Sequence, residues 1–173
     1  MTVKIKLTQG QETEIDDEDA DLARFKWTAS FEPNRAGGGF VAMRKVYSNR
    51  GNRTEYMHRV ILSRILGRPL LRSELVDHEH GNPLLNIRSE LRLATYSQNA
   101  MNKGKRSDNS CGFKGVCRVS GSKKWRAQIQ VDGIKVHLGT FDTAEEASEA
   151  YCKAAPRYHG KFAKVSTYEE DTP

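Results

Sequence analysis

The stretch from Val76 to Pro83 constrains this chain most, because it places two chemically active residues side by side at the end of an apolar run. Asp77 and His78 close that run, and a Gly-Asn-Pro turn signal follows them. A second apolar run, Leu91 to Ala94, can pair back on the first as an antiparallel strand. The sequence therefore predicts a hairpin that carries Asp77 and His78.

A helix is expected directly after this hairpin. Thr95 stands three residues before Gln98, which is the spacing of a capping box, and Asn99 falls in the first turns of that helix. Two strands and a helix thereby bring Asp77, His78 and Asn99 toward one point. Neighbours on a regular strand face opposite sides, so Asp77 and His78 share a site only if the strand ends or twists there.

A carboxylate, an imidazole and an amide are the groups that metal-assisted phosphodiester hydrolysis needs. A hard divalent cation such as Mg²⁺ prefers oxygen ligands and keeps several waters. Asp77 and Asn99 would supply protein oxygens, and phosphate oxygens would complete the shell. His78 would take a proton from the attacking water, since imidazole titrates near neutral pH.

Residues 76–99 resemble the HNH (ββα-metal) nucleases, in particular the phage and intron-encoded homing endonucleases. The matching segments are Val-Asp-His-x-x-Gly-Asn at 76–82, Glu-Leu-Arg at 90–92 and Thr-x-x-x-Asn at 95–99. The resemblance implies Asp77 and Asn99 as ligands of Mg²⁺, Mn²⁺ or another divalent cation. It implies His78 as the general base.

The middle Asn of the family pattern is Glu90 in this chain. In the family that Asn mainly braces the loop that carries the catalytic His. Three outcomes are open: Glu90 braces the loop differently, Asn86 or Asn82 takes over, or activity is reduced.

Other polar residues near the expected site have two interpretations each. His58 either packs behind the active site or touches DNA, and His80 is expected at the rim of the loop. Asn102 shares a helix face with Asn99, so it either reaches the outer shell of the metal, caps the helix or contacts DNA. The surrounding cations either position phosphates or form a solvated helix face; they are Arg88, Arg92, Lys103, Lys105 and Arg106.

The net charge of +6 is distributed unevenly over the 173 residues. Residues 1–25 hold seven acidic and three basic side chains, a net charge of −4, so the rest of the chain carries +10. A basic body fits a polyanionic partner, and we expect double-stranded DNA. The alternative is an ordinary basic surface.

The composition excludes several other classes of protein. Three Cys without a C-x-x-C spacing argue against a disulfide framework and against a Cys-based zinc site. There is neither an 18-residue apolar span nor a signal-peptide pattern. We therefore expect no membrane partner and a soluble protein, with a monomer favoured, in the cytoplasm of a bacterial or phage-infected cell.

The residues before the hairpin have a β-rich pattern. Strands are expected at 2–7, 26–31 and 40–44, and a further hairpin joins 45–47 to 54–57. A helix is expected from Ile15 to Phe25, with its acidic run as a solvated face. A second helix runs from His58 to Leu66 and ends at Gly67.

A polar linker at 104–110 leads to a module with its own pattern. Strands are expected at 112–119, 124–131 and 134–139, with a type I′ turn at Asp132-Gly133. Thr143 and Glu146 form a capping box for a helix that runs from Ala144 to about Ala155. The helix packs through Ala147, Ala150, Tyr151 and Ala154, so the other face of the sheet stays open.

Alternation in the middle strand assigns side chains to the two faces of this sheet. Ala127, Ile129 and Val131 point toward the helix, whereas Arg and Gln side chains point to the open face, where they can read base edges. A merely solvated face is the alternative, and Trp125 either covers the sheet edge or lies against the DNA backbone. The residues expected on the open face are Arg118, Arg126, Gln128, Gln130, Lys135 and His137.

Residues 111–166 resemble the AP2 (ethylene-response-factor type) DNA-binding domain. The matching segments are Phe-Lys-Gly-Val at 113–116, Lys-Trp-Arg-Ala-Gln-Ile at 124–129 and Leu-Gly-Thr-Phe at 138–141, continued by Asp-Thr-Ala-Glu-Glu-Ala at 142–147 and Tyr-His-Gly-Lys-Phe-Ala at 158–163. Lys114 and Trp125 are also among the expected DNA contacts. Cys152 departs from the pattern, as does Pro156, which should stop the helix early.

These observations predict an α+β chain in which a small ββα-metal nuclease core follows a β-rich segment and precedes a three-stranded antiparallel sheet with a helix. The expected parts are an N-terminal segment at 1–56, the core at 57–105, a linker at 106–110, the AP2-like domain at 111–166 and a tail at 167–173. The expected function is a metal-dependent DNA endonuclease, with a homing or nicking role by analogy. The alternative is a DNA-binding protein whose nuclease core is inactive.

Overall fold

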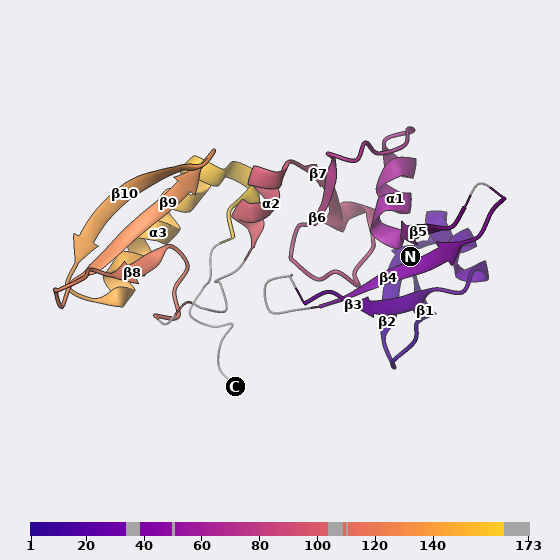
Figure 1. Cartoon of the computed structure of the whole chain (residues 1–173), viewed down its shortest axis with the longest axis horizontal. Coiled ribbons are helices and arrows are strands. Elements are labelled where there is room, and N and C mark those ends of the chain that lie inside the picture. Colours follow the sequence, from indigo (N-terminus) through magenta and orange to yellow (C-terminus); the bar gives the residue numbers. More distant parts are fainter. Residues whose placement is uncertain (34–38, 50, 104–108, 110, 165–173) are drawn as a thin grey trace. The chain divides into compact units, whose positions relative to one another are not determined.

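The computed structural model describes residues 1–33, 39–49, 51–103, 109 and 111–164. The chain divides into two compact units, Met1–Thr95 and Tyr96–Pro173. Each unit combines short antiparallel strands with helices (Figure 1), and the predicted α+β class is confirmed. The predicted linker lies outside the described residues except for Asn109, and the predicted tail lies outside them entirely.

The first unit opens with a hairpin and a three-stranded sheet. The hairpin pairs β1 (Thr2–Lys6) with β2 (Glu12–Asp16), and it turns through Gln9 and Gly10, which both have positive φ. The sheet has the order β3 (Thr28–Phe31), β4 (Phe40–Val46) and β5 (Arg53–Tyr56). The predicted strands are therefore present, and β4 continues through the segment at 45–46 that was expected to begin a separate hairpin.

The helix expected from Ile15 to Phe25 is not formed as predicted. Ile15 belongs to β2, where it is fully buried, and a 3-10 helix, η1 (Asp17–Arg24), follows. The acidic run is also not wholly solvated, because Asp19 is fully buried. Two arginines from distant segments explain this burial: Arg64 Nη1 lies 2.9 Å and Arg88 Nε 2.8 Å from the Asp19 carboxylate.

Helix α1 (Met57–Ile65) packs against β4, β5 and a second hairpin. That hairpin pairs β6 (Leu75–His78) with β7 (Leu91–Ala94), and the short η2 (Arg88–Glu90) precedes β7. One hydrophobic core spans the unit; its buried members are Ile5, Ile15, Leu22, Trp27, Ala42, Met57, Ile61, Leu62, Val76 and Leu91. Burial of each large side chain contributes about 1.5–3 kcal/mol to the stability of the fold. Because this core contains residues of 1–56 and of the second hairpin, the two segments stabilise each other.

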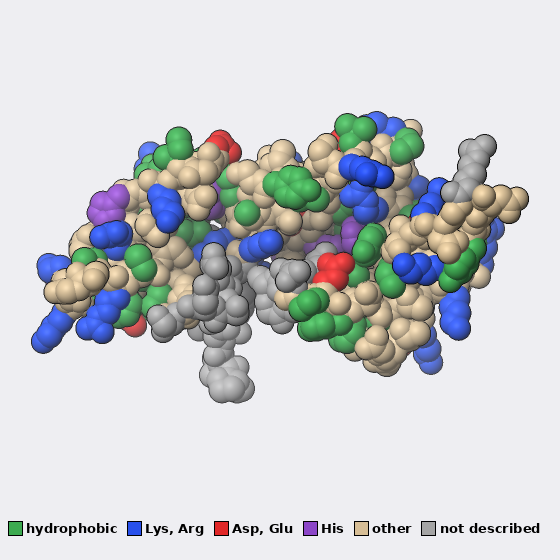
Figure 2. All heavy atoms as spheres, in the orientation of Figure 1, with side chains coloured by type: hydrophobic (Ala, Val, Ile, Leu, Met, Phe, Trp, Pro, Cys, Tyr) green, Lys and Arg blue, Asp and Glu red, His purple; other side chains and the backbone are tan. Residues whose placement is uncertain are grey.

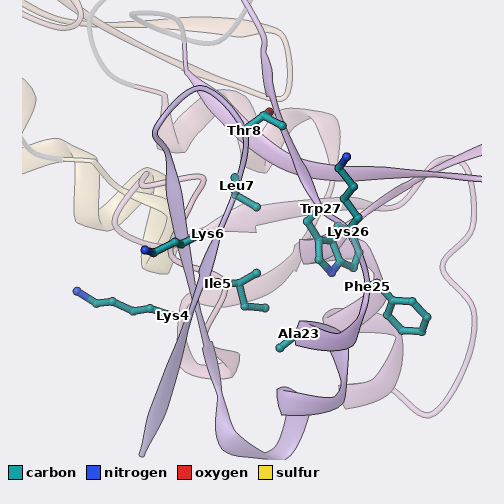
Figure 3. A pocket seen from close by; sticks show the side chains of 9 residues that line it. All are labelled: Lys4, Ile5, Lys6, Leu7, Thr8, Ala23, Phe25, Lys26 and Trp27. Atoms are coloured by element: carbon teal, nitrogen blue, oxygen red, sulfur yellow. The ribbon is translucent and has the colours of Figure 1, made fainter.

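A hollow of about 390 Å³ lies beside β1 in this unit. Figure 3 shows Ile5 and Leu7 on the side of β1 that faces Trp27, whereas Lys4 and Lys6 point away from it. None of the residues that line the hollow belongs to the predicted active site.

The second unit contains a sheet with the order β10 (Ile134–Phe141), β9 (Trp125–Val131) and β8 (Val116–Arg118). Helix α3 (Ala144–His159) covers one face of this sheet (Figure 1). Helix α2 (Tyr96–Asn102) and the short η3 (Gly160–Phe162) contact each other. The buried residues on both sides of the sheet-helix interface are Val116, Ala127, Ile129, Ala144, Ala147, Tyr151 and Ala155.

Two local predictions in this unit are confirmed. Thr143 Oγ1 accepts a hydrogen bond from the Glu146 amide, and the Glu146 side chain accepts one from the Thr143 amide, which completes the capping box. Asp132 and Gly133 have φ values of 48° and 84°, as a type I′ turn requires.

Two other predictions are wrong. The strand expected at 112–119 is reduced to Val116–Arg118, because residues 111–115 form a turn in which Gly112 and Gly115 have positive φ. Pro156 does not stop α3, which continues to His159. The last turn is held by tertiary contacts, since Ala155 is fully buried and His159 Nε2 lies 3.0 Å from the Gln130 carbonyl oxygen.

The packing face of α3 includes Ala147 and Tyr151 as predicted, with Ala155 rather than Ala154 as the buried residue one turn later. No helix in the described part of the chain is both long and apolar enough to cross a membrane.

Candidate active site and nucleic-acid interface

Asp77 and His78 lie at the end of β6, and both are almost completely buried, with 4% and 3% of their surface exposed. Asp77 is paired with Arg92 across the hairpin, and Arg92 Nε donates to Asp77 Oδ2 at 2.8 Å. Arg92 also donates to Glu79 at 3.0 Å through Nη1. Arg92, one of the cations expected near the site, thus fixes the orientation of the Asp77 carboxylate.

The imidazole of His78 is held from the loop that joins β6 to η2. His78 Nε2 lies 3.2 Å from Oδ1 of Asn86, which is fully buried. The ring of His58, on α1, packs edge-on against the His78 ring with 5.5 Å between centroids. His58 is itself buried, which supports the interpretation that it packs behind the site.

Glu90, which replaces the family Asn, binds a different histidine. Its carboxylate lies 2.8 Å from His80 Nδ1 and accepts a hydrogen bond from the His80 amide at 3.3 Å. The imidazole of His80 is largely exposed, at the rim of the loop where it was expected. Asn82 accepts a hydrogen bond from the Leu84 amide within the turn. Among the three candidates, Asn86 is therefore the residue that contacts His78.

Arg88 is held by acidic residues of the first unit. Its guanidinium binds Asp19 and, at 2.6 Å, Glu18, and its amide donates to Asp16 Oδ2 at 2.6 Å. The nearby carboxylates, Asp19 foremost, raise the pKa of Arg88 above its usual value. These contacts hold the loop on η1, and a phosphate contact of Arg88 stays a prediction.

The remaining residues of the predicted core lie on or after α2, in the second unit. Asn99 is half-buried, Asn102 is buried and Lys103 is exposed at the end of the helix. Lys105 and Arg106 lie outside the described residues. A site that joins Asn99 to Asp77 and His78 therefore stays a prediction.

The predicted ligands, Asp77 and Asn99, offer a carboxylate and an amide oxygen, which are the donor types that suit a hard cation. Within the ranges described, no group of three or more His, Cys, Asp and Glu residues could hold a metal ion. That excludes a His- and Cys-rich cage among these residues. One carboxylate and one amide suit Mg²⁺, which is commonly bound through one or two carboxylates together with substrate phosphates.

The open face of the sheet in the second unit is polar and basic. Register pairs Gln130 with Lys135, Gln128 with His137, and Arg126 with Thr140 beyond a bulge at His137 to Gly139. A shallow groove of about 290 Å³ runs over this face, lined by Arg126, Gln128, Lys135, His137 and Thr140. Lys and Arg side chains are spread over the visible surface of this unit, shown in Figure 2.

Three predicted DNA contacts are placed differently. Register pairs Arg118 with Trp125 and Cys117 with Arg126, so the residue of β8 on the open face is Cys117 and the placement of Arg118 is corrected. Trp125 is half-buried and packs with Val116 and Ala127, which supports the interpretation that it covers the sheet. Arg118 lies 5.9 Å from the Trp125 ring.

Lys114 is the third of these residues. Its ammonium donates to the Met101 carbonyl at the end of α2. Burial, with a smaller contribution from the charge of Lys164, lowers the pKa of Lys114 to about 8. Lys114 therefore joins α2 to the turn before β8, and its contact with DNA stays a prediction.

Three residues of these surfaces were not predicted from the sequence. Thr13 and Asp19 are buried polar residues, and Thr140 lines the groove of the open sheet. Thr13 is almost completely buried on β2, between Ile5 and Ile15, where alternation would favour an aliphatic residue. A polar residue at an apolar position of a strand pattern indicates a buried hydrogen bond, so the sequence alone could have singled out Thr13. The burial of Asp19 leaves no local signal, because its two partners are 45 and 69 residues away.

The fold and these surfaces define an α+β protein with two modules, one with a buried Asp-His pair at a strand end and one with an open basic sheet. No family profile matches the chain. It is 34% identical over 107 residues to "Uncharacterized HNH endonuclease L560" of Acanthamoeba polyphaga mimivirus, across 62% of this chain and 54% of that protein. It is 28% identical over 96 residues to "Protein 3.8" of Escherichia phage T7, across 56% of this chain and 78% of that protein.

A separate similarity concerns plant proteins. The chain is 37% identical over 73 residues to "AP2-like ethylene-responsive transcription factor TOE2" of Arabidopsis thaliana, across 40% of this chain and 15% of that protein. The two resemblances seen in the sequence, to HNH endonucleases and to AP2 domains, are thereby confirmed. The chain spans about half the length of the mimivirus relative and a smaller part of the plant one.

Proposed function

We propose that the chain is a metal-dependent DNA endonuclease that hydrolyses phosphodiester bonds and uses its second unit to bind double-stranded DNA. The observation that carries this proposal is the Asp77-His78 pair at the end of β6, with each side chain held by a separate partner. A relative named as an HNH endonuclease supports the same assignment.

His78 is the general base of the proposed reaction. Its ring is buried and contacts Asn86 and the His58 ring, which restrict its orientation. A fixed imidazole that removes a proton in the transition state accelerates such reactions by about 10²–10⁴. Asp77, held by Arg92, and Asn99 would be the protein ligands of Mg²⁺, Mn²⁺ or another divalent cation. When bound, that cation would stabilise negative charge on the phosphate and the leaving oxygen.

The open sheet of the second unit supplies the proposed DNA contacts. Arg126 and Gln128 are the types of side chain that hydrogen-bond to base edges, and Lys135 can meet a phosphate. The proposed site at Asp77 and His78 would cut one strand per visit, so the expected product is a nick. A homing role is proposed by analogy alone.

Plasmid relaxation, measured beside a gel shift, tests the proposal. Wild type should nick supercoiled DNA with Mg²⁺ or Mn²⁺ and not with EDTA. His78→Ala should bind DNA normally and cut at least about 100-fold more slowly. The matched control is His80→Ala, which removes an exposed imidazole from the same loop and should cut at nearly the wild-type rate.

Either of two results would contradict the nuclease assignment. If wild type binds DNA but cuts with no divalent metal, the chain is a DNA-binding module with an inactive core. If His78→Ala cuts as fast as wild type, another residue is the base.

A further inference from the structure

The loop that carries Asn86 is attached to the N-terminal hairpin. The Glu14 amide donates to the Leu84 carbonyl at 3.1 Å, and the Asn86 amide donates to the Glu14 carbonyl at 2.8 Å. These two bonds form a short parallel bridge between β2 and the loop. Strand β2 therefore sets the position of the loop residue that touches His78.

A buried chain of side-chain hydrogen bonds runs along this bridge. Thr13 Oγ1 lies 2.7 Å from the Leu84 carbonyl oxygen and 2.7 Å from Asn86 Nδ2. Asn86 Oδ1 then lies 3.2 Å from His78 Nε2. Thr13, Asn86 and His78 are each no more than 3% exposed, so water does not replace these bonds.

The direction of every bond in this chain follows from its first acceptor. A carbonyl oxygen only accepts, so the Thr13 hydroxyl donates its single proton to Leu84 and must accept from Asn86. A weaker alternative acceptor, Met57 Sδ at 3.8 Å, would use the same proton and leave the result unchanged. Asn86 is thus oriented with Nδ2 toward Thr13 and Oδ1 toward His78.

An amide oxygen facing His78 requires a proton on Nε2. In the neutral imidazole the second nitrogen, Nδ1, then carries the lone pair. We propose that Thr13 is a positioning residue that, through Asn86, holds His78 in the Nε2–H tautomer and so makes Nδ1 the nitrogen that accepts a proton. This inference rests on the proposed nuclease function for its role in catalysis, whereas the tautomer itself does not.

Through Thr13, the N-terminal hairpin would thus contribute to the reaction. Thr13 does not touch the substrate, but it fixes the orientation of an amide that would otherwise be free to flip. A flipped Asn86 would present Nδ2 to His78 and favour the Nδ1–H tautomer, in which the lone pair points into the protein at Nε2. The base would then be withdrawn from the attacking water.

Imidazole ¹⁵N–¹H correlation spectra of the full chain test the tautomer directly, with the His78 signal assigned from its loss in His78→Ala. Wild type should show neutral His78 as Nε2–H. Thr13→Val keeps the shape of the side chain and removes the hydroxyl, so it should show a mixture of tautomers. Thr13→Ser restores the hydroxyl and should restore the Nε2–H form.

Nicking rates of the same variants provide the second readout. Thr13→Val should cut at least about tenfold more slowly than wild type, and Thr13→Ser should recover most of the rate. A wild-type His78 in the Nδ1–H form, or an unchanged tautomer in a folded Thr13→Val, would overturn the inference. If the tautomer shifts as expected while wild type cuts no DNA, the positioning role stands and the nuclease proposal fails.

Discussion

Asp19 is the residue on which two arginines from distant parts of the first unit converge. Its carboxylate is fully buried and binds Arg64 from α1 and Arg88 from η2. Arg88 in turn precedes Glu90 and follows the loop that carries Asn86. A single buried carboxylate thus connects η1, α1 and the loop next to the proposed base.

We expect Asp19→Asn to lower the free energy of unfolding of the first unit by about 2–4 kcal/mol, because removal of one partner leaves buried charge poorly compensated. Arg64 and Arg88 are each about one-third exposed, so solvent reduces the loss below that of a fully buried pair. Urea denaturation measures the change, and a Trp125→Phe background leaves buried Trp27 as the reporter of the first unit.

The control is Asp21→Asn, which acts on the same arginine from the surface. Arg64 donates to both Asp21 oxygens, at 2.7 and 2.8 Å, and this bond lowers the pKa of Asp21. Because Asp21 is exposed, its loss should cost less than about 1 kcal/mol. Equal losses in the two variants would show that burial of Asp19 contributes nothing.

Single residues were predictable where the chemistry is local. The positions of Asp77 and His78 at a strand end follow from a motif, and the position of Arg126 on the open face of β9 follows from alternation. Asn86 was one of three residues considered, and only the loop geometry distinguishes it from Glu90 and Asn82. The roles of Arg88 and Asp19 depend on ion pairs between residues 69 positions apart, which no local pattern encodes.

At the scale of elements, Gly115 lies where a turn, β9 and α3 come into close contact. It has φ +73°, and its carbonyl accepts from the Gln128 amide at 2.8 Å. A Cβ at this position would lie 2.7 Å from the Gln128 carbonyl oxygen and would overlap the Tyr151 ring on α3. The contact among the turn, β9 and α3 therefore requires glycine.

Gly115→Ala should destabilise the second unit by about 2–5 kcal/mol, the sum of a left-handed backbone penalty and an overpacked interface. Gly121→Ala is the matched control, because Gly121 has φ +70° and open space around it, so only the backbone penalty of about 1–2 kcal/mol applies. Thermal unfolding in a Trp27→Phe background reports the second unit through Trp125. A loss no greater than that of Gly121→Ala would contradict the packing argument.

Elements whose ends are determined by neighbouring residues in the sequence were predicted well. Elements whose ends are determined by tertiary packing were not. The Asp132-Gly133 turn and the Thr143–Glu146 capping box fix their elements from within four residues. Pro156 lies in a helix that local rules end earlier, because contacts of Ala155 and His159 with the sheet outweigh the lost hydrogen bond. Arg118 lies off the expected face because the turn at 119–124 sets the register of β8 against β9.

At the scale of the whole molecule, the two units have separate hydrophobic cores. A change on the open sheet of the second unit should therefore leave the Asp77-His78 pair intact. Under the proposed function, DNA binding by the open sheet and cutting by the Asp77-His78 pair should therefore be separable by mutation. His78→Ala removes cutting and keeps binding, and variants of the sheet should do the reverse.

The double variant Arg126→Ala/Lys135→Ala should weaken binding to double-stranded DNA by about 10- to 100-fold, since it removes a base-reading side chain and a phosphate contact. The slope of log K against log salt should become shallower by about one to two units. At saturating DNA the nicking rate should stay near that of wild type, because the lost contacts contribute to ground-state binding rather than to the transition state. Gel shifts across a salt series and single-turnover nicking measure these effects.

A control that removes the same charge separates recognition by the sheet from general attraction. Lys153→Ala/Arg157→Ala takes two positive charges from α3, on the other side of the sheet, where Lys153 pairs with Glu149. If the open sheet binds DNA, this variant should lose much less affinity than the sheet variant. If both variants lose equal affinity, net charge alone attracts the DNA and the sheet face has no special role. If only the helix variant loses affinity, the DNA lies on α3, and the AP2-like assignment of the binding face is wrong.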